Sequence, residues 1–139
     1  MRLYLNGQDI SRLVLVDIDD ETSVYTHQGE PESFLEAIIK FLHSRDRVLK
    51  EVKEIYTVVG PGSATSLRTT VTILNVLAFA HKIILFGFKK EKDEQDIGSV
   101  RAIVENKINF VQQGTQLIPI YENSPKITES TRDALKRRN

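Results

Sequence analysis

The sequence EIYTVVGPGSATSLRTTVTILNVLAFAHK, residues Glu54 to Lys82, predicts a strand, a tight turn and a helix in direct succession. Ile55 to Val59 is a short, nearly continuous apolar run, which is typical of a strand covered on both faces, as in a parallel sheet. Gly60 to Gly62 ends the strand. Ser63 or Thr65 can cap the helix that follows, because a hydroxyl there can accept from unpaired N–H groups of the first turn. We therefore expect the rest of the chain to be arranged around this unit.

The helix predicted over Thr65 to Lys82 carries two apolar stripes, at about 100° per residue. One stripe consists of Leu67, Val71, Leu74 and Ala78, and the other, on roughly the opposite side, of Ile73, Val76, Phe79 and Ala80. A surface helix needs only one apolar stripe, so this helix is expected to be covered twice. One cover would be the sheet, and the other a helix of this chain or a partner.

Residues 60–68, GPGSATSLR, resemble the GPGSFTGLR signature of the TsaB (YeaZ) family, accessory subunits for the threonylcarbamoyladenosine modification of tRNA. Ala64 stands where the family has Phe, and Ser66 where it has Gly. The resemblance spans roughly Leu3 to Phe88, the first subdomain of a TsaB-like protein. The remaining chain is far too short for the second subdomain, so the resemblance implies a short, divergent member.

Length, charge and composition narrow the class of protein. The 139 residues suit about one domain. Nineteen basic and nineteen acidic residues give a formal net charge of zero, so no global field draws the chain to nucleic acid or membrane. There is no cysteine for a disulfide or thiolate site. Neither a signal peptide nor a membrane-spanning apolar run is visible. We expect a soluble, cytoplasmic protein.

The segments before the central strand predict a meander and a helix. Leu3 to Asn6, Leu13 to Asp19 and Ser23 to His27 read as three strands, and their brief connections favour antiparallel pairing. Pro31 suits the first position of a helix, predicted over Glu32 to Ser44.

After the central helix, Ile83 to Phe88 reads as a second buried strand, which would complete a right-handed parallel βαβ unit. Lys89 to Asp96 has no apolar residue and is predicted to be a solvated loop. A short helix is expected at Val100 to Val104. Ile108 to Val111 and Gln116 to Tyr121 suggest a hairpin about residues 113–115. We expect one domain over residues 1–121 and a flexible polar tail over 122–139.

The resemblance and the element order together favour an α/β protein with a mixed sheet. The order of three strands, helix, strand, helix and strand (βββαβαβ), plus a short C-terminal extension, is that of the ribonuclease-H-like (actin-like ATPase) fold. Periodicity alone would allow other α/β sandwiches.

Two polar stretches could carry chemistry. The loop Gly60, Gly62, Ser63 could bind an anion at the helix N-terminus, but Pro61 lacks an N–H and no lysine follows as in a phosphate-binding loop. Asp17, Asp19, Asp20 and Glu21 could hold Mg²⁺, yet aspartates are also favoured in turns. Actin-like enzymes hold their metal with an aspartate on the first strand. Asn6 to Gln8 occupies that place here without a carboxylate.

No catalytic constellation is visible, because His27, His43 and His81 are scattered and neither Ser63 nor Ser66 has an obvious basic partner. We therefore predict no enzymatic activity, no metal site and no cofactor.

The resemblance implies a non-catalytic subunit that pairs with a TsaD-like catalytic subunit, forms homodimers in isolation and is involved with tRNA only indirectly. The residues expected to bind the partner are Thr69, Thr72, Ile73, Val76, Phe79, Ile38 and Leu35. One alternative is an actin-like enzyme that binds ATP with Mg²⁺ at the Gly60 loop. Another is a self-associating domain unrelated to tRNA modification.

Overall fold

The computed structural model describes residues 1–20 and 23–120, which form a six-stranded mixed sheet in the order β3-β2-β1-β4-β5-β6. The strands are β1 (Arg2–Asp9), β2 (Arg12–Asp17), β3 (Tyr25–Gln28), β4 (Glu54–Gly60), β5 (Ile84–Lys89) and β6 (Gln112–Gly114). The helices are α1 (Phe34–Ser44), α2 (Ala64–His81) and α3 (Asp96–Val104), with 3₁₀ turns at Pro31–Ser33 and Leu49–Glu51. The tail predicted over residues 122–139 lies outside the described residues.

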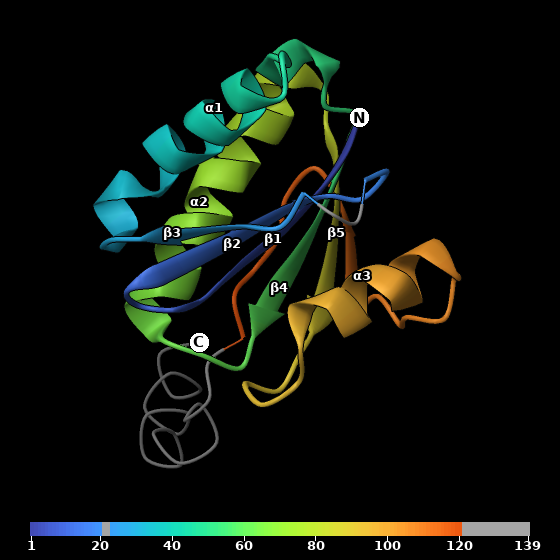
Figure 1. The fold of residues 1–139 in the computed structure, drawn as a ribbon. Helices are drawn as coiled ribbons and strands as arrows, with labels where there is room; N and C mark the ends of the chain where they lie inside the picture. The colour runs from blue at the N-terminus through green and yellow to red at the C-terminus, as the bar shows by residue number, and fades with distance from the viewer. Residues whose placement is uncertain (21–22, 121–139) are drawn as a thin grey trace, which may run out of the picture.

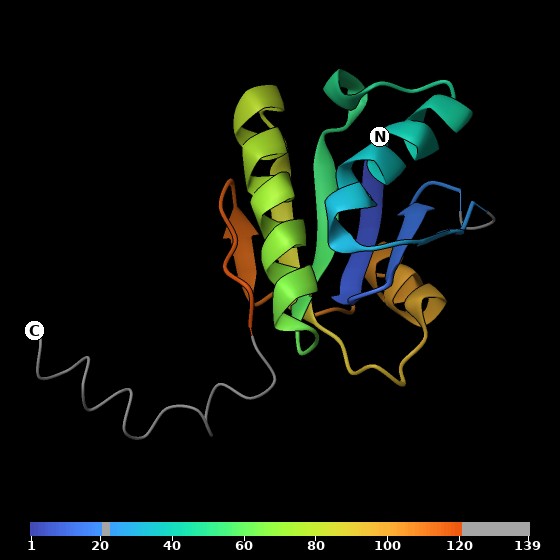
Figure 2. The same cartoon turned by 90° about the vertical axis from the view of Figure 1, so that its left-hand side faces the viewer.

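The sheet is covered by α1 and α2 on one face and by α3 on the other, as Figures 1 and 2 show. β1, β2 and β3 pair antiparallel, so the predicted meander is confirmed. β4 pairs parallel with β1 and with β5, and α2 joins β4 to β5. The predicted parallel βαβ unit is therefore confirmed, as is the mixed α/β class. Assignment to the ribonuclease-H-like fold stays a prediction.

Two apolar cores lie on the two faces of the sheet, because successive strand residues point to opposite sides. On β1, Leu3 and Leu5 enter the core beneath α1 and α2, whereas Tyr4 enters the core beneath α3. On β4, Val59 belongs to the first core and Val58 to the second. Burial on both faces explains the continuous apolar runs that mark these strands in the sequence.

The region after α3 differs from the predicted hairpin. β6 occupies residues 112–114, where the turn was expected, and pairs antiparallel with β5. The Gln112 side chain accepts from the backbone N–H of Ile118 at 2.7 Å and donates to its carbonyl at 2.8 Å. One amide side chain thus takes the place of a second strand, which a periodicity argument cannot detect.

The segment predicted as a solvated loop is partly packed, so that prediction was wrong at its ends. Lys90 is only 3% exposed, and Asp96 is the first residue of α3. Glu91 to Gln95 is exposed, as expected. Within the described residues, no helix combines the length and the apolar character that a membrane span requires.

Candidate functional site

The turn between β4 and α2 is fixed by contacts with β1. The Gly60–Pro61 peptide bond is cis. Ser63 caps α2, because its Oγ accepts from the Ser66 N–H at 3.3 Å, which confirms one of the two predicted caps. The Ser63 N–H itself donates to the Gln8 carbonyl at 2.9 Å. A Cβ on Gly62 would lie 2.7 Å from the Gln8 Cβ and carbonyl oxygen, so only glycine fits here.

Ser66, which departs from the TsaB signature, joins α2 to the end of β1. The buried Ser66 hydroxyl lies within hydrogen-bond distance of the carbonyl oxygens of Gly7 and Asp9, the latter at 3.0 Å. One turn later, Thr70 packs directly against the Cα of Gly7. The helix therefore approaches this strand very closely, and a polar group at position 66 satisfies the strand carbonyls there.

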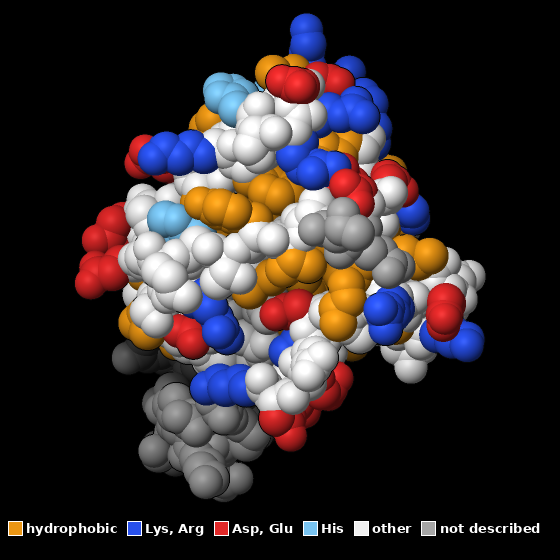
Figure 3. Space-filling view, in the orientation of Figure 1, with side chains coloured by type: hydrophobic (Ala, Val, Ile, Leu, Met, Phe, Trp, Pro, Cys, Tyr) orange, Lys and Arg blue, Asp and Glu red, His pale blue; other side chains and the backbone are white. Residues whose placement is uncertain are grey.

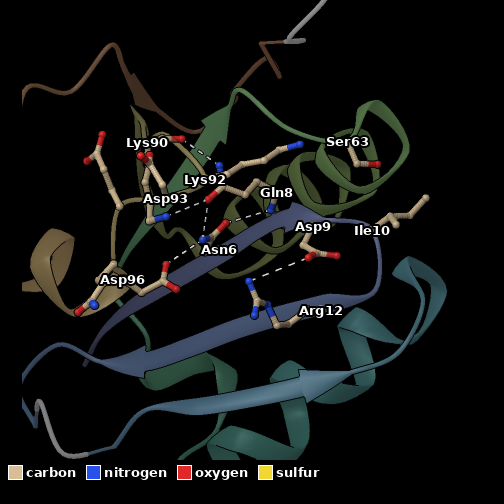
Figure 4. A pocket seen from close by; sticks show the side chains of 12 residues that line it. Asn6, Gln8, Asp9, Ile10, Arg12, Ser63, Lys90, Lys92, Asp93 and Asp96 are labelled. Atoms are coloured by element: carbon tan, nitrogen blue, oxygen red, sulfur yellow. Dashed lines mark hydrogen bonds and ion pairs between the residues drawn. The ribbon is translucent and has the colours of Figure 1, made fainter.

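A polar cleft of about 560 Å³ opens beside this turn, at the carboxyl end of β1 (Figure 4). Its lining brings together β1, the β1–β2 turn, the start of α2 and the β5–α3 loop. The lining residues are Asn6, Gln8, Asp9, Ile10, Arg12, Ser63, Lys90, Lys92, Asp93, Glu94, Gln95 and Asp96. Of these residues, Ser63 was predicted as part of an anion-binding loop, and Asn6 to Gln8 were noted only for lacking a metal-binding carboxylate. The contribution of the β5–α3 loop was not predicted.

Buried amides and charges on the cleft floor form one hydrogen-bonded chain. Lys90 Nζ donates to Gln8 Oε1 at 3.2 Å, and Asn6 Nδ2 donates to the same oxygen at 3.0 Å. Asn6 Nδ2 also donates to Asp96 Oδ1 at 2.7 Å. Tyr4 donates its hydroxyl to Asp96 Oδ1 at 2.6 Å. Burial raises the pKa of Tyr4, and the charge of Asp96 raises it further, so the hydroxyl stays protonated and can donate.

The Gln8 amide ties three segments together through its remaining donors. Gln8 Nε2 donates to the carbonyls of Pro61, at 2.8 Å, and Lys90, at 2.9 Å. Every polar atom of the Gln8 side chain is therefore engaged within the protein. The floor is satisfied without a bound molecule, which favours a structural role for this network.

The predicted anion-binding loop keeps few donors for an anion. The N–H groups of Ser63 and Ser66 are used within the protein, and Pro61 has none. Gly60 is in a positive-φ conformation and lies against the Ile120 carbonyl. Anion binding at Gly60, Gly62 and Ser63 stays a prediction.

The acidic turn after β2 is engaged by arginines. Arg45 lies 3.3 Å from Asp17 and 2.6 Å from Asp20, and Arg2 lies 2.7 Å from Asp19. The hydrogen bond from Arg2 lowers the pKa of Asp19 below its ordinary value. In the part of the chain that the structure describes, no three His, Asp or Glu side chains are close enough to hold a metal ion.

The two apolar stripes of α2 differ in solvent exposure. Leu67, Val71, Leu74 and Ala78 are buried against the sheet, as predicted. On the other side, Val76 is 61% exposed and Phe79 is 87% exposed. We call the residues Thr69, Thr72, Ile73, Val76 and Phe79 the α2 face. Thr72 is exposed, and Thr69 and Ile73 are half-buried.

No described segment covers the centre of the α2 face. α1 lies on one side of α2, and the segment 112–120 lies on the other (Figure 2). That segment is fixed by Asn75, whose side chain accepts from the Leu117 N–H at 2.8 Å and donates to its carbonyl at 3.0 Å. A shallow hollow of about 370 Å³ lies between α2 and this segment, lined by Asn75, Val76, Phe79, Thr115 and Gln116.

Of the two residues predicted to contribute from α1, only one is accessible. Leu35 is exposed, whereas Ile38 is 1% exposed and belongs to the core beneath α1 and α2. The prediction that Ile38 lies on the partner-binding surface was therefore wrong, because its side chain is buried. Its spacing with Phe34, Phe41 and Leu42 places it on the buried face of α1.

Comparisons with known proteins identify the fold. No family model and no curated protein matches this sequence. The solved structure of YeaZ from Pseudomonas aeruginosa matches with a TM-score of 0.53 at 19% identity, over 63% of this chain and 44% of that one. A second structure, an uncharacterized protein with similarity to peptidase YEAZ from Pseudomonas aeruginosa, matches with a TM-score of 0.53 at 20% identity, over 63% and 42%. The chain thus shares the YeaZ fold over 63% of its length, and the match covers less than half the length of either of these proteins.

Proposed function

We propose that this chain is a TsaB-like, non-catalytic subunit that supports the threonylcarbamoyladenosine modification of tRNA by associating with a TsaD-like catalytic subunit. The observation that carries this proposal is the exposed apolar α2 face, with Val76 and Phe79 at its centre. Large apolar side chains concentrate binding energy in interface cores. The GPGSATSLR stretch and the YeaZ fold support the particular partner. The site of action would be the cytoplasm, and contact with tRNA would be indirect.

The proposal is tested with Val76→Glu, which would place an unpaired charge in the centre of the contact. At a cost of about 3 kcal/mol, binding to a TsaD-like protein from the same organism should weaken by more than about a hundredfold. Binding is measured by calorimetry, and tRNA modification by a reconstituted assay with and without this chain.

Val104→Glu is the matched control. Val104 is also an exposed valine on a helix, but it ends α3 on the opposite side of the sheet. A folded Val76→Glu protein that binds like the parent would refute the role of the α2 face. A chain that neither binds the TsaD-like protein nor supports modification would refute the proposed function and leave the two alternatives, the actin-like enzyme and the self-associating domain unrelated to tRNA modification.

The alternative, an actin-like enzyme that binds ATP with Mg²⁺, is favoured by one observation: the 560 Å³ cleft lies beside the Gly60 to Ser63 turn. Against it, the floor of the cleft is already hydrogen-bonded internally. A titration with ATP, with and without Mg²⁺, separates the two functions. Tight, metal-dependent binding that Arg12→Ala weakens and Arg47→Ala leaves unchanged would support the enzyme, because only Arg12 lines the cleft.

A further inference from the structure

The polar cleft lies where two neighbouring parallel strands send the chain to opposite faces of the sheet. β4 leads into α2 on one face, whereas β5 leads through residues 90–95 into α3 on the other (Figures 1 and 2). Such a divergence opens a crevice at the carboxyl ends of the strands, which is where open α/β sheets bind their ligands. A volume of about 560 Å³ at this position suits a small molecule.

Lys90 brings a buried positive charge to the floor of the cleft. It is 3% exposed, and its Nζ donates to Gln8 Oε1 at 3.2 Å and to the Glu91 carbonyl at 3.0 Å. Both acceptors are neutral, and an ammonium group has three N–H donors, so one N–H remains. Among the described residues, no carboxylate oxygen lies within 4.0 Å of this nitrogen. A bound carboxylate would offset the cost of burying this charge.

Asp96 holds the opposite charge at the other end of the hydrogen-bonded chain on the floor. Its Oδ1 accepts from Tyr4 at 2.6 Å and from Asn6 at 2.7 Å, so the carboxylate is fixed in place. In the part of the chain that the structure describes, Oδ2 of this carboxylate has no hydrogen-bond partner. The amides of Asn6 and Gln8 stand between this carboxylate and Lys90 (Figure 4). The cleft therefore presents one fixed cation and one fixed anion.

The remaining charges of the lining narrow the class of ligand. They are two cations and three carboxylates, namely Arg12, Lys92, Asp9, Asp93 and Glu94. Figure 3 shows acidic and basic side chains close together at the lower end of the molecule, where the β5–α3 loop lies in Figure 1. Four carboxylates against three cations in the whole lining disfavour a polyanion such as ATP, because like charges repel. A small zwitterion would pair with both fixed charges.

We infer that the cleft binds a free amino acid, with its carboxylate at Lys90 and its ammonium group at Asp96 Oδ2. The amides of Asn6 and Gln8 keep their internal hydrogen bonds and hold the two charged groups in position, which reduces the cost of ordering on binding. This inference goes beyond the proposed function and does not depend on it. The residues that carry it line the cleft, whereas the proposed partner binds the α2 face.

The first test needs no variant. Each of the common L-amino acids is titrated into the full chain at neutral pH, and binding is followed by the backbone amide shifts in NMR spectra. At least one should bind with a Kd below about 1 mM. The best binder is then compared with its carboxamide, which lacks the carboxylate, and with its N-acetyl derivative, which lacks the ammonium group. Each derivative should bind at least tenfold more weakly.

The second test uses variants at the two fixed charges. Lys90→Met removes the charge and keeps most of the length of the side chain, so binding should be lost. Lys89→Met is the matched control, because Lys89 is exposed and does not line the cleft. Asp96→Asn keeps an oxygen that can accept from Tyr4, and it should weaken binding at least tenfold. Melting curves establish which variants fold, and Asp96→Asn and the two derivatives still decide if Lys90→Met does not.

The outcomes separate this inference from the proposed function. Failure of every amino acid to bind would overturn the inference, as would equal binding of the amino acid and its derivatives. A folded Lys90→Met or Asp96→Asn chain that binds like the parent would also overturn it. ATP that competes with the amino acid and binds more tightly would overturn it in favour of the actin-like enzyme. Binding of the TsaD-like protein through the α2 face is measured separately and decides only the proposed function.

Discussion

Ser66 shows how one hydroxyl can determine the fit of a helix on a strand. It replaces the glycine of the TsaB signature, and its side chain meets the carbonyls of Gly7 and Asp9. Ser66→Ala should lower the free energy of unfolding by about 1–2 kcal/mol, because a buried carbonyl loses its donor. Denaturant unfolding measures this, with Thr65→Ala on the exposed side as control. Equal losses in both variants would contradict the role of the contact.

The Arg2–Asp19 pair predicts a small dependence of stability on pH. Because the hydrogen bond from Arg2 lowers the pKa of Asp19 in the folded state, the pair contributes stability above the ordinary aspartate pKa of about 3.9. That contribution is lost as pH falls through the lower folded-state pKa. Both side chains are well exposed, so it amounts to less than about 1 kcal/mol.

Asp19→Asn is the variant that checks this dependence. It should be slightly less stable than the parent at pH 7, and the gap should close as the pH falls through the lowered folded-state pKa of Asp19. Unfolding curves at several pH values give the comparison. A gap that does not narrow as the pH falls into the acidic range would rule out the ion pair as its cause.

The positions of Lys90 and Asp96 could not be predicted from the sequence. Their neighbourhood has no apolar residue, so composition indicates full exposure. Yet Lys90 contacts Gln8, 82 positions away, and Asp96 contacts Asn6, 90 positions away. Contacts of this range depend on which strands are neighbours in the sheet. Ser63, by contrast, was predictable, because a cap and the helix that it caps are adjacent in sequence.

The helix α2 permits a paired test at the scale of one element. Leu74 is fully buried, whereas Val76 is 61% exposed, two residues further on. Leu74→Glu should prevent folding, because an unpaired charge would enter the core. Val76→Glu should melt within a few degrees of the parent. Circular dichroism during heating distinguishes the two, and a Val76→Glu protein that also fails to fold would show that both stripes are internal.

The loop between β5 and α3 provides a second test at this scale. Deleting Lys92 and Asp93, both exposed, should change stability by less than about 1 kcal/mol, since loop length enters only logarithmically. Replacing Lys90 with Ala should cost more, because the Gln8 network loses a buried member. The comparison is made by denaturant unfolding. If the deletion were the more harmful change, the exposed part of the loop would have to be packed.

For the molecule as a whole, the periodicity of apolar residues was enough to predict the elements whose contacts follow from regular secondary structure. The strands and helices up to β5 were predicted because each has its own apolar pattern and short connections. Residues 108–120 were not, because their position depends on Asn75 holding Leu117 and on the Gln112 side chain. The two apolar stripes of α2 were predicted from periodicity, and that the exposed stripe binds a partner stays a prediction. Ile38 on α1 was misplaced because α1 buries that side.

The two edge strands of the sheet affect how the molecule could associate with other chains. β3 has four residues and β6 has three, so each rim offers only a brief row of unpaired backbone groups. Strand addition, which lengthens a sheet across two chains, has little template at either rim. The short rims agree with the proposal that a partner is recognised through side chains on a helix, which discriminate between sequences. Backbone groups at a rim would accept almost any extended segment.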